Sequence, residues 1–173
     1  MFQPVGTSTH KLSLLGPGDD IPSVCGPLGR PSEIAGFGTV LLAAGCFGLA
    51  AIHPIARALK AAGNRVVILA DVKAAYLLYW EDKLRAVSDR FVVASRDGAF
   101  QTRDFVARRI DAALEEEKPV ARVAAVGCSY LMYACAEATR PAGVKTVVSL
   151  NPVMVDGTGM CGACRVTVDG RTR

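Results

Sequence analysis

The sequence has little of what marks several common classes of protein. Its 173 residues carry 20 Lys and Arg against 16 Asp and Glu, so the net charge is only +4. Basic and acidic residues are interleaved, and no stripe of Lys and Arg is accompanied by aromatic residues, which make up 6% of the chain. A nucleic-acid interface normally concentrates positive charge in that way. The composition therefore argues against nucleic acid as a partner.

Long apolar runs are also missing. The longest, residues 39–52, is too short to span a bilayer and is interrupted by Gly45 and Gly48. The N-terminus lacks the basic segment followed by an apolar one that marks a secretory signal. Of the six cysteines, four lie in or beside apolar segments, where buried free cysteine is common. We therefore expect a reduced, cytoplasmic protein without a membrane span, with Cys46 and Cys128 in its core.

Apolar residues are abundant, at 51% of the chain, and their arrangement predicts the fold. Residues 1–35 are rich in Gly and Pro, and their short apolar pieces predict β-hairpins or the end of a barrel. From residue 36 onward, apolar strands alternate with helices, which predicts a doubly wound α/β domain with a parallel five-stranded sheet over residues 36–152. The expected strands begin at residues 39, 65, 91, 122 and 145, and the expected helices cover residues 49–62, 74–87, 102–118 and 131–140.

Ligands of such sheets bind beyond the carboxyl ends of the strands. There, Gly45 and Gly48 form a strand-to-helix turn whose N–H groups and helix dipole favour a phosphate. Asp71 follows at about the distance at which an acidic residue meets the ribose hydroxyls. Asp97 and Gly127 end the third and fourth strands. Together these residues favour a nucleotide, with tight packing as the alternative for the glycines, a solvated strand end for Asp71 and a plain turn for Asp97.

The C-terminal segment carries the most specific motif. Asp156, Cys161 and Cys164 have the spacing Asp-x4-Cys-x2-Cys in a Gly-rich turn. This resembles the plant-type ferredoxin spacing Cys-x4-Cys-x2-Cys, with Asp in place of the first thiolate. A [2Fe-2S] cluster needs four ligands, and the sequence offers three of them before Arg173. A zinc site would require another close Cys or His pair, and both histidines are distant in sequence; a redox disulfide is the remaining alternative.

Five segments carry a resemblance to one protein family. They are residues 26–33, 53–60, 77–82, 139–141 and, most specifically, 148–168, VSLNPVMVDGTGMCGACRVTV. They resemble the small, flavin-containing subunit of NADH-dependent ferredoxin:NADP oxidoreductase, also known as sulfide dehydrogenase. That family is similar to the electron-transfer subunit of dihydroorotate dehydrogenase and, more distantly, to ferredoxin–NADP reductases.

The resemblance implies a division into domains. It implies the end of an FAD-binding β-barrel at residues 1–35, an NAD(P)-binding α/β domain at 36–152 and part of a [2Fe-2S] lobe at 153–173. The resemblance also implies that the chain is truncated at both ends and that the fourth cluster ligand is a cysteine just past Arg173. The resemblance also implies ligand-binding residues: Gly6, Thr7 and Ser8 for the flavin pyrophosphate, and Asp156, Cys161 and Cys164 as cluster ligands.

The implied function is electron transfer between NAD(H) or NADP(H), FAD and a [2Fe-2S] cluster, towards ferredoxin or a larger flavin/iron–sulfur partner subunit. Hydride transfer between nicotinamide and flavin needs little acid–base help, so the lack of a catalytic triad does not count against an oxidoreductase. The alternative is a non-catalytic nucleotide-binding or assembly subunit that has lost its flavin and cluster.

The nucleotide turns depart from the family pattern. Ala44, Cys46 and Ala51 stand where the family usually has further glycines and a proline. At the end of the fourth strand, Cys128 follows Gly127 where a proline is usual.

Overall fold

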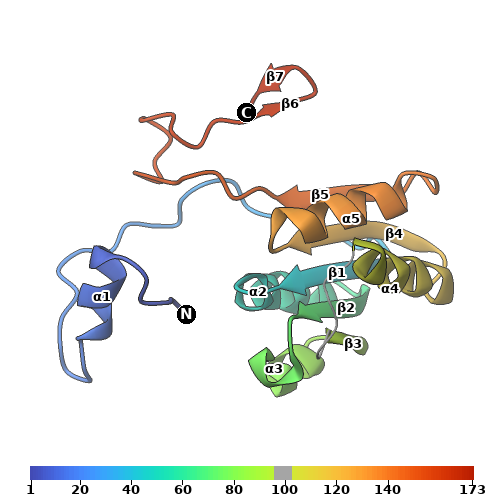
Figure 1. The fold of residues 1–173 in the computed structure, drawn as a ribbon, viewed down its shortest axis with the longest axis horizontal. Coiled ribbons are helices and arrows are strands. Elements are labelled where there is room, and N and C mark those ends of the chain that lie inside the picture. The colour runs from blue at the N-terminus through green and yellow to red at the C-terminus, as the bar shows by residue number, and fades with distance from the viewer. Residues whose placement is uncertain (96–102) are drawn as a thin grey trace. The chain divides into compact units, whose positions relative to one another are not determined.

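The computed structural model describes residues 1–95 and 103–173 (Figure 1). The chain divides into two compact units, one of Ser32–Pro152 and one that combines Met1–Pro31 with Val153–Arg173. The expected division into three domains, at residues 35 and 152, stays a prediction.

The unit Ser32–Pro152 is built on five parallel strands in the order β3-β2-β1-β4-β5. This order, with the helices described below, confirms the predicted doubly wound α/β fold. The strands are β1 (Thr39–Gly45), β2 (Arg65–Val72), β3 (Arg90–Ser95), β4 (Val120–Val126) and β5 (Lys145–Ser149).

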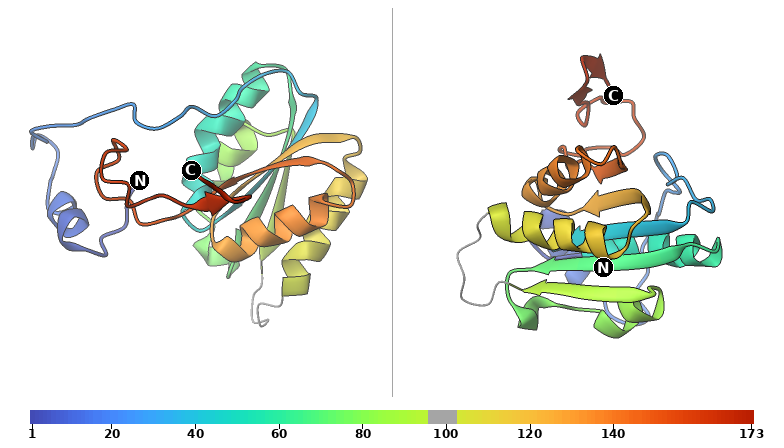
Figure 2. Two further views of the ribbon diagram at one scale, coloured as in Figure 1. Left: turned by 90° about the horizontal axis from the view of Figure 1, so that it is seen from above. Right: turned by 90° about the vertical axis from the view of Figure 1, so that its right-hand side faces the viewer.

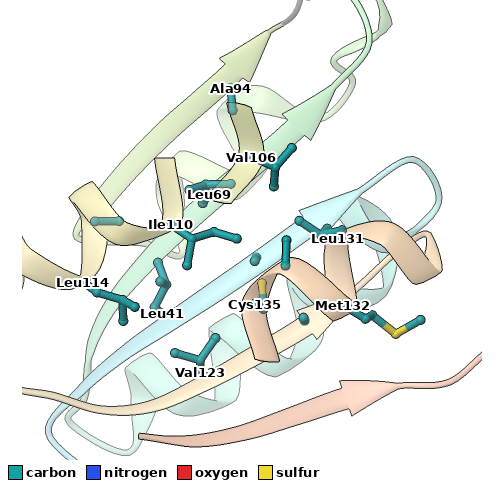
Figure 3. Packing of buried hydrophobic residues seen from close by; sticks show 14 of the residues in the cluster. Leu41, Leu69, Ala94, Val106, Ile110, Leu114, Val123, Leu131, Met132 and Cys135 are labelled. Atoms are coloured by element: carbon teal, nitrogen blue, oxygen red, sulfur yellow. The ribbon is translucent and has the colours of Figure 1, made fainter. Parts of the chain in front are cut away.

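Helices cover both faces of this sheet, and strand β1 shows why its sequence is apolar throughout. Leu41 and Ala43 belong to the cluster beneath α4 (Arg103–Glu116) and α5 (Ser129–Thr139), which Figure 3 shows from close by. Val40 and Leu42 belong to the cluster beneath α2 (Gly48–Ala61) and α3 (Glu81–Ala86). Successive side chains of a strand point to opposite faces, so a strand covered on both sides has to be apolar at every position.

The region predicted as one helix over residues 74–87 is divided. A 3-10 turn, η1 (Ala75–Leu77), is followed by the short helix α3. Between them Trp80 has a φ of 59°, a left-handed conformation that no α-helix passes through. The apolar spacing of this segment indicates a helix, but the left-handed conformation of Trp80 interrupts it, and the single-helix prediction is wrong.

Residues 1–35, all of which the structure describes, contain helix α1 (Thr7–Ser13) and no strand. The β-hairpins predicted there are therefore not found. The Thr9 hydroxyl accepts hydrogen bonds from the N–H groups of Val5 and Gly6, each at 3.0 Å, and donates one to the Gly6 carbonyl. These side-chain hydrogen bonds fix the backbone at the start of α1. Within the helix the backbone groups bond to one another, whereas a strand needs a neighbouring strand.

The remaining strands form a hairpin near the C-terminus, β6 (Thr167–Val168) and β7 (Arg171–Thr172). Its two central residues, Asp169 and Gly170, have φ values of 51° and 68°. Positive φ at both positions is the signature of a type I′ turn, for which Asp-Gly is a favoured sequence. No helix in the described part of the chain is long and apolar enough to cross a membrane.

A buried carboxylate, Glu117, binds two arginines at the end of the sheet at which the strands begin. Glu117 accepts hydrogen bonds from Arg65 Nε at 2.8 Å and from Arg90 Nη1 at 2.9 Å. Its side chain is only 6% exposed. The hydrogen bond from Arg65 is the main cause that holds the pKa of Glu117 below its ordinary value of 4.5.

We expect Glu117→Gln to lower the free energy of unfolding at pH 7 by roughly 1–3 kcal/mol, because Arg65 loses its charged partner and Arg90 loses one of its two, keeping Glu116. The lowered pKa means that this contribution is present above the ordinary glutamate range and is lost as the pH falls below it. Urea unfolding at neutral pH and below pH 4.5 should therefore show the two proteins converging on acidification. The matched control is Glu115→Gln, which removes an exposed pair with Lys118. A deficit of similar size in the control would contradict the assignment.

Candidate functional site

At one point in the sheet, the helices that follow two neighbouring strands lie on opposite faces. Strand β1 leads into α2 on one face, whereas its neighbour β4 leads into α5 on the other. In the left view of Figure 2, α2 (cyan) and α5 (orange) lie on opposite sides of the strands. In open α/β sheets, ligands bind in the crevice beyond the strand ends at such a point.

Three of the predicted nucleotide residues meet at this crevice. Gly45 pairs with Asp71 of β2, and a Cβ on Gly45 would lie 3.1 Å from the Asp71 carbonyl oxygen. A Cβ on Gly127 would lie 3.1 Å from both the nitrogen and the oxygen of Gly45. The structure therefore brings Gly45, Asp71 and Gly127 together at the carboxyl ends of three adjacent strands.

Gly48 serves the packing of α2. A Cβ at this position would lie 2.0 Å from the carbonyl oxygen of Val126, which is closer than any real contact. The first residue of α2 thus packs directly on the end of β4. The alternative of tight packing accounts for this glycine, and it is also what places the N-terminus of α2 at the crevice.

Asp71 is 4% exposed. Its carboxylate lies beside Gly45, with Oδ2 3.6 Å from the position of a Gly45 Cβ. This burial excludes the alternative of a solvated strand end. Asp97 lies outside the described residues.

Two side chains that the sequence analysis missed hold the turns of the crevice. The Tyr79 hydroxyl donates to the Cys46 carbonyl at 2.9 Å and accepts from the Ala50 N–H at 3.2 Å, and burial raises the pKa of Tyr79. Asn151 Nδ2 donates to the Gly127 carbonyl at 2.7 Å. Tyr79 follows β2, the neighbour of β1, and Asn151 follows β5, the neighbour of β4. Their positions therefore depend on the strand order and not on a spacing in the sequence.

The cysteines of the crevice are not where the sequence analysis expected them. Cys46 and Cys128 are both exposed, so their prediction as core residues is wrong. The apolar strands end just before each of them, and both lie in the turns that follow. Cys135 of α5 is buried, and this burial, with a smaller effect from Asp71, raises its pKa to about 12.

Cys46 has a φ of 50°, a left-handed conformation that strains a residue with a side chain. We expect Cys46→Gly to raise the free energy of unfolding by about 1 kcal/mol, because glycine adopts this conformation without strain. The matched control is Cys128→Gly, since Cys128 has a φ of −70° that suits any residue. Denaturant unfolding of both variants checks the prediction, and a gain of the same size in Cys128→Gly would contradict it.

The C-terminal loop is organised by Asp156. Oδ2 accepts the N–H of Cys161 at 2.9 Å, and Oδ1 accepts the N–H groups of Thr158 at 3.0 Å and Gly159 at 3.3 Å. The hydrogen bond from Cys161 is the main cause that lowers the pKa of Asp156 to about 2. The carboxylate is therefore ionised at neutral pH and holds the loop in a closed turn.

The two cysteines of the motif lie on this same loop. Cys161 is exposed and Cys164 is partly exposed, and both are free thiols. The Ala163 N–H contacts the Cys161 sulfur at 3.5 Å. Among residues 1–95 and 103–173, no three His, Cys, Asp or Glu side chains are placed around one metal position. The loop thus presents two thiols while its carboxylate is engaged with the backbone.

The predicted flavin contacts lie at the start of helix α1. Gly6 is the N-cap of this helix, and Thr7 and Ser8 are its first two residues. All three are exposed. Their contact with a flavin stays a prediction.

The chain was compared with known proteins. Residues 151–173 match the iron–sulfur cluster binding domain of dihydroorotate dehydrogenase B. Over 98% of its length the chain is 44% identical to the dihydroorotate dehydrogenase B (NAD(+)) electron transfer subunit homolog of Thermotoga maritima. A probable electron transfer subunit of the same enzyme from Methanopyrus kandleri is 31% identical over 92% of the chain.

The chain is a homologue of these electron-transfer subunits. A solved structure agrees. A chain of the NADH-dependent reduced ferredoxin–NADP oxidoreductase, which is described in connection with flavin-based electron bifurcation, matches 98% of the present chain with a TM-score of 0.83 and 42% identity. The predicted resemblance is thereby confirmed. The C-terminal domain of a Pyrococcus furiosus hydrogenase matches 72% of the present chain with a TM-score of 0.63 and 21% identity, which supports the fold alone.

The present chain spans about three fifths of the length of the relatives that it matches. It covers 59% of the Thermotoga maritima protein, 60% of the Methanopyrus kandleri protein and 60% of the oxidoreductase chain. The activity, substrates and partners of a whole protein are accordingly matters for proposal.

Proposed function

We propose that the chain is the nucleotide-binding and iron–sulfur part of an electron-transfer oxidoreductase subunit. It would pass electrons between NAD(H) or NADP(H), FAD and a [2Fe-2S] cluster, towards ferredoxin or a larger partner subunit. The observation that carries the proposal is the Asp156–Cys164 loop. Its spacing matches an iron–sulfur motif, and it lies in the segment similar to the cluster-binding domain of dihydroorotate dehydrogenase B.

The nucleotide belongs in the crevice between β1 and β4. The helix dipole at the N-terminus of α2 would favour the phosphates there, while Gly45 and Gly127 keep the strand ends free of side chains. Tyr79 and Asn151 position the two turns through the Cys46 and Gly127 carbonyls. In this arrangement the protein binds and orients the nicotinamide nucleotide, and acid–base catalysis is not required.

The donor set of the C-terminal loop suits the proposed cluster. Cys161 and Cys164 would supply soft thiolate ligands, and Asp156, ionised at neutral pH, would supply a harder one. A carboxylate oxygen has more than one lone pair, so Asp156 is able to keep a backbone N–H while it binds iron. When bound, a [2Fe-2S] cluster supplies one-electron transfer. Gly6, Thr7 and Ser8 are the proposed contacts to the FAD pyrophosphate.

The experiment is nucleotide binding by calorimetry. Asp71 should disfavour a 2′-phosphate, so we expect NADH to bind more tightly than NADPH and Asp71→Ala to reduce the difference. The matched control is Lys73→Ala, because the exposed Lys73 would instead attract that phosphate. An NADPH preference that Lys73→Ala removes would refute the role of Asp71. Absence of binding to either nucleotide would refute the proposed function of the crevice.

The second candidate is a nucleotide-binding or assembly subunit without flavin and cluster. The observation that favours it is that both carboxylate oxygens of Asp156 bond to backbone N–H groups, so the three motif side chains do not surround one position. Iron and acid-labile sulfide analysis, with the visible spectrum, distinguishes the two candidates in protein that carries the expected fourth cysteine ligand. Stoichiometric iron and sulfide would refute the second.

A further inference from the structure

Two exposed cysteines follow the two strands at the switch point of the sheet. Cys46 follows β1 and Cys128 follows β4, and these strands are neighbours in the sheet. The last residues in register, Ala44 and Val126, each stand two positions before a cysteine. The proposed electron transfer uses neither thiol.

The backbone remains in close contact up to both cysteines. On one side of Cys46, Gly45 lies against Gly127, where an added Cβ would be 3.1 Å away. On the other side, Gly48 lies against the Val126 carbonyl, 2.0 Å from the position of its own Cβ. The residues on both sides of Cys46 therefore touch the two residues that precede Cys128.

This approach suits a disulfide. Gly45 and Gly127, the residues that immediately precede the two cysteines, are in contact, and the Cα atoms of a disulfide are roughly 4.4–6.8 Å apart. Cys46 lies in a turn and Cys128 is the N-cap of α5, so a link between them replaces no strand hydrogen bond.

We propose that Cys46 and Cys128 form a redox-sensitive dithiol that closes into a disulfide across the crevice. The oxidant is a low-molecular-weight disulfide such as oxidised glutathione. One cysteine thiolate attacks it, which forms a mixed disulfide and releases one small thiol. The second cysteine thiolate then attacks the cysteine sulfur of the mixed disulfide and releases the other. The protein loses two electrons and two protons, and the small disulfide takes up both to become two thiols.

The consequence of the disulfide rests on the proposed nucleotide function. The Cys46 turn leads directly into the N-terminus of α2, where the phosphates would bind, and a link to Cys128 joins this turn to the opposite wall of the crevice. Oxidation should therefore exclude the nucleotide, and a thiol reductant should restore binding. Cys135 does not compete for the oxidant, since burial raises its pKa to about 12.

The test treats the reduced full chain with oxidised glutathione, alkylates the remaining thiols and maps the peptides by mass spectrometry. We expect an intramolecular link between Cys46 and Cys128 and the loss of two hydrogen atoms from the protein mass. Cys46→Ser and Cys128→Ser should each abolish the link, and the control Cys25→Ser should keep it. Glutathione on both Cys46 and Cys128 without a link, or a link from either to another cysteine, would overturn the proposal.

A second measurement compares NADH binding before and after oxidation. We expect oxidation to weaken binding by roughly tenfold or more, the scale of losing charge-assisted hydrogen bonds to phosphate. The double variant Cys46→Ser/Cys128→Ser should bind equally with and without the oxidant. Unchanged NADH affinity in the disulfide form would overturn the gating role. If the reduced chain binds no nucleotide, the proposed function of the crevice fails, while the peptide map still decides whether the disulfide forms.

Discussion

Replacing Gly48 by alanine should destabilise the α/β unit by roughly 3 kcal/mol or more, because the new methyl group collides with backbone. The Cβ would lie 2.0 Å from the Val126 carbonyl oxygen and 2.6 Å from its carbon. Neither atom is at the end of a flexible side chain, so relief requires α2 to move away from β4. Alanine favours a helix over glycine by only about 1 kcal/mol, which does not offset the collision.

Urea unfolding of Gly48→Ala checks this expectation, with soluble yield as a second readout. The matched control is Gly36→Ala in the same unit, where the nearest atom, the Ala62 carbonyl oxygen, is 3.6 Å from the Cβ position. That distance is ordinary van der Waals contact, and the control should stay within about 0.5 kcal/mol of the wild type. If both variants unfold at the same urea concentration, the packing role assigned to Gly48 is wrong.

The result also separates two explanations of a glycine in a strand-to-helix turn. A glycine kept only to admit a phosphate would tolerate alanine in the absence of nucleotide, with loss of binding alone. A glycine kept for packing fails without any ligand present. The structure supports packing at Gly48, whereas Gly45 and Gly127 lie in the floor of the crevice, where both explanations apply.

The sheet was predictable because its signal is local and repeated. Each buried strand is a short apolar run, and the covering of both faces follows from the absence of polar alternation. Helix α1 and the break at Trp80 were not predictable from composition, since they depend on a local cap at Thr9 and on one left-handed residue. Apolar spacing contains no information on either.

The site was only partly predictable for a different reason. Gly45, Asp71 and Gly127 were found because strand ends are visible in the sequence. Tyr79 and Asn151 act on turns 33 and 24 residues away, contacts that depend on the strand order. The exposure of Cys46 and Cys128 was not predictable from their apolar neighbours, because each cysteine follows the buried part of its strand.

The C-terminal motif was visible in the sequence, yet the sequence did not indicate the hydrogen bonds that Asp156 accepts from its own loop. Its carboxylate has a pKa of about 2 and accepts hydrogen bonds from three N–H groups of its own loop. Asp156 therefore has two separable roles, as a backbone clamp and as a proposed ligand.

In protein that carries the expected fourth cysteine ligand and is reconstituted with iron and sulfide, Cys161→Ala or Cys164→Ala should abolish the [2Fe-2S] absorbance, because each removes a thiolate ligand. Cys25→Ala is the matched control, since Cys25 is an exposed cysteine outside the motif, and it should leave the spectrum unchanged. A stable cluster in the double variant Cys161→Ala/Cys164→Ala would refute the ligand assignment.

Asp156→Cys separates the two roles of the carboxylate. If Asp156 is a ligand, a thiolate in its place should keep the cluster and shift its reduction potential, since a softer donor replaces a harder one. If Asp156 acts only as a clamp, cysteine does not replace a carboxylate that accepts three N–H groups, and the cluster should be lost. The visible spectrum and a redox titration of this variant decide between ligation and clamping, because ligation alone predicts a cluster that persists at a new potential.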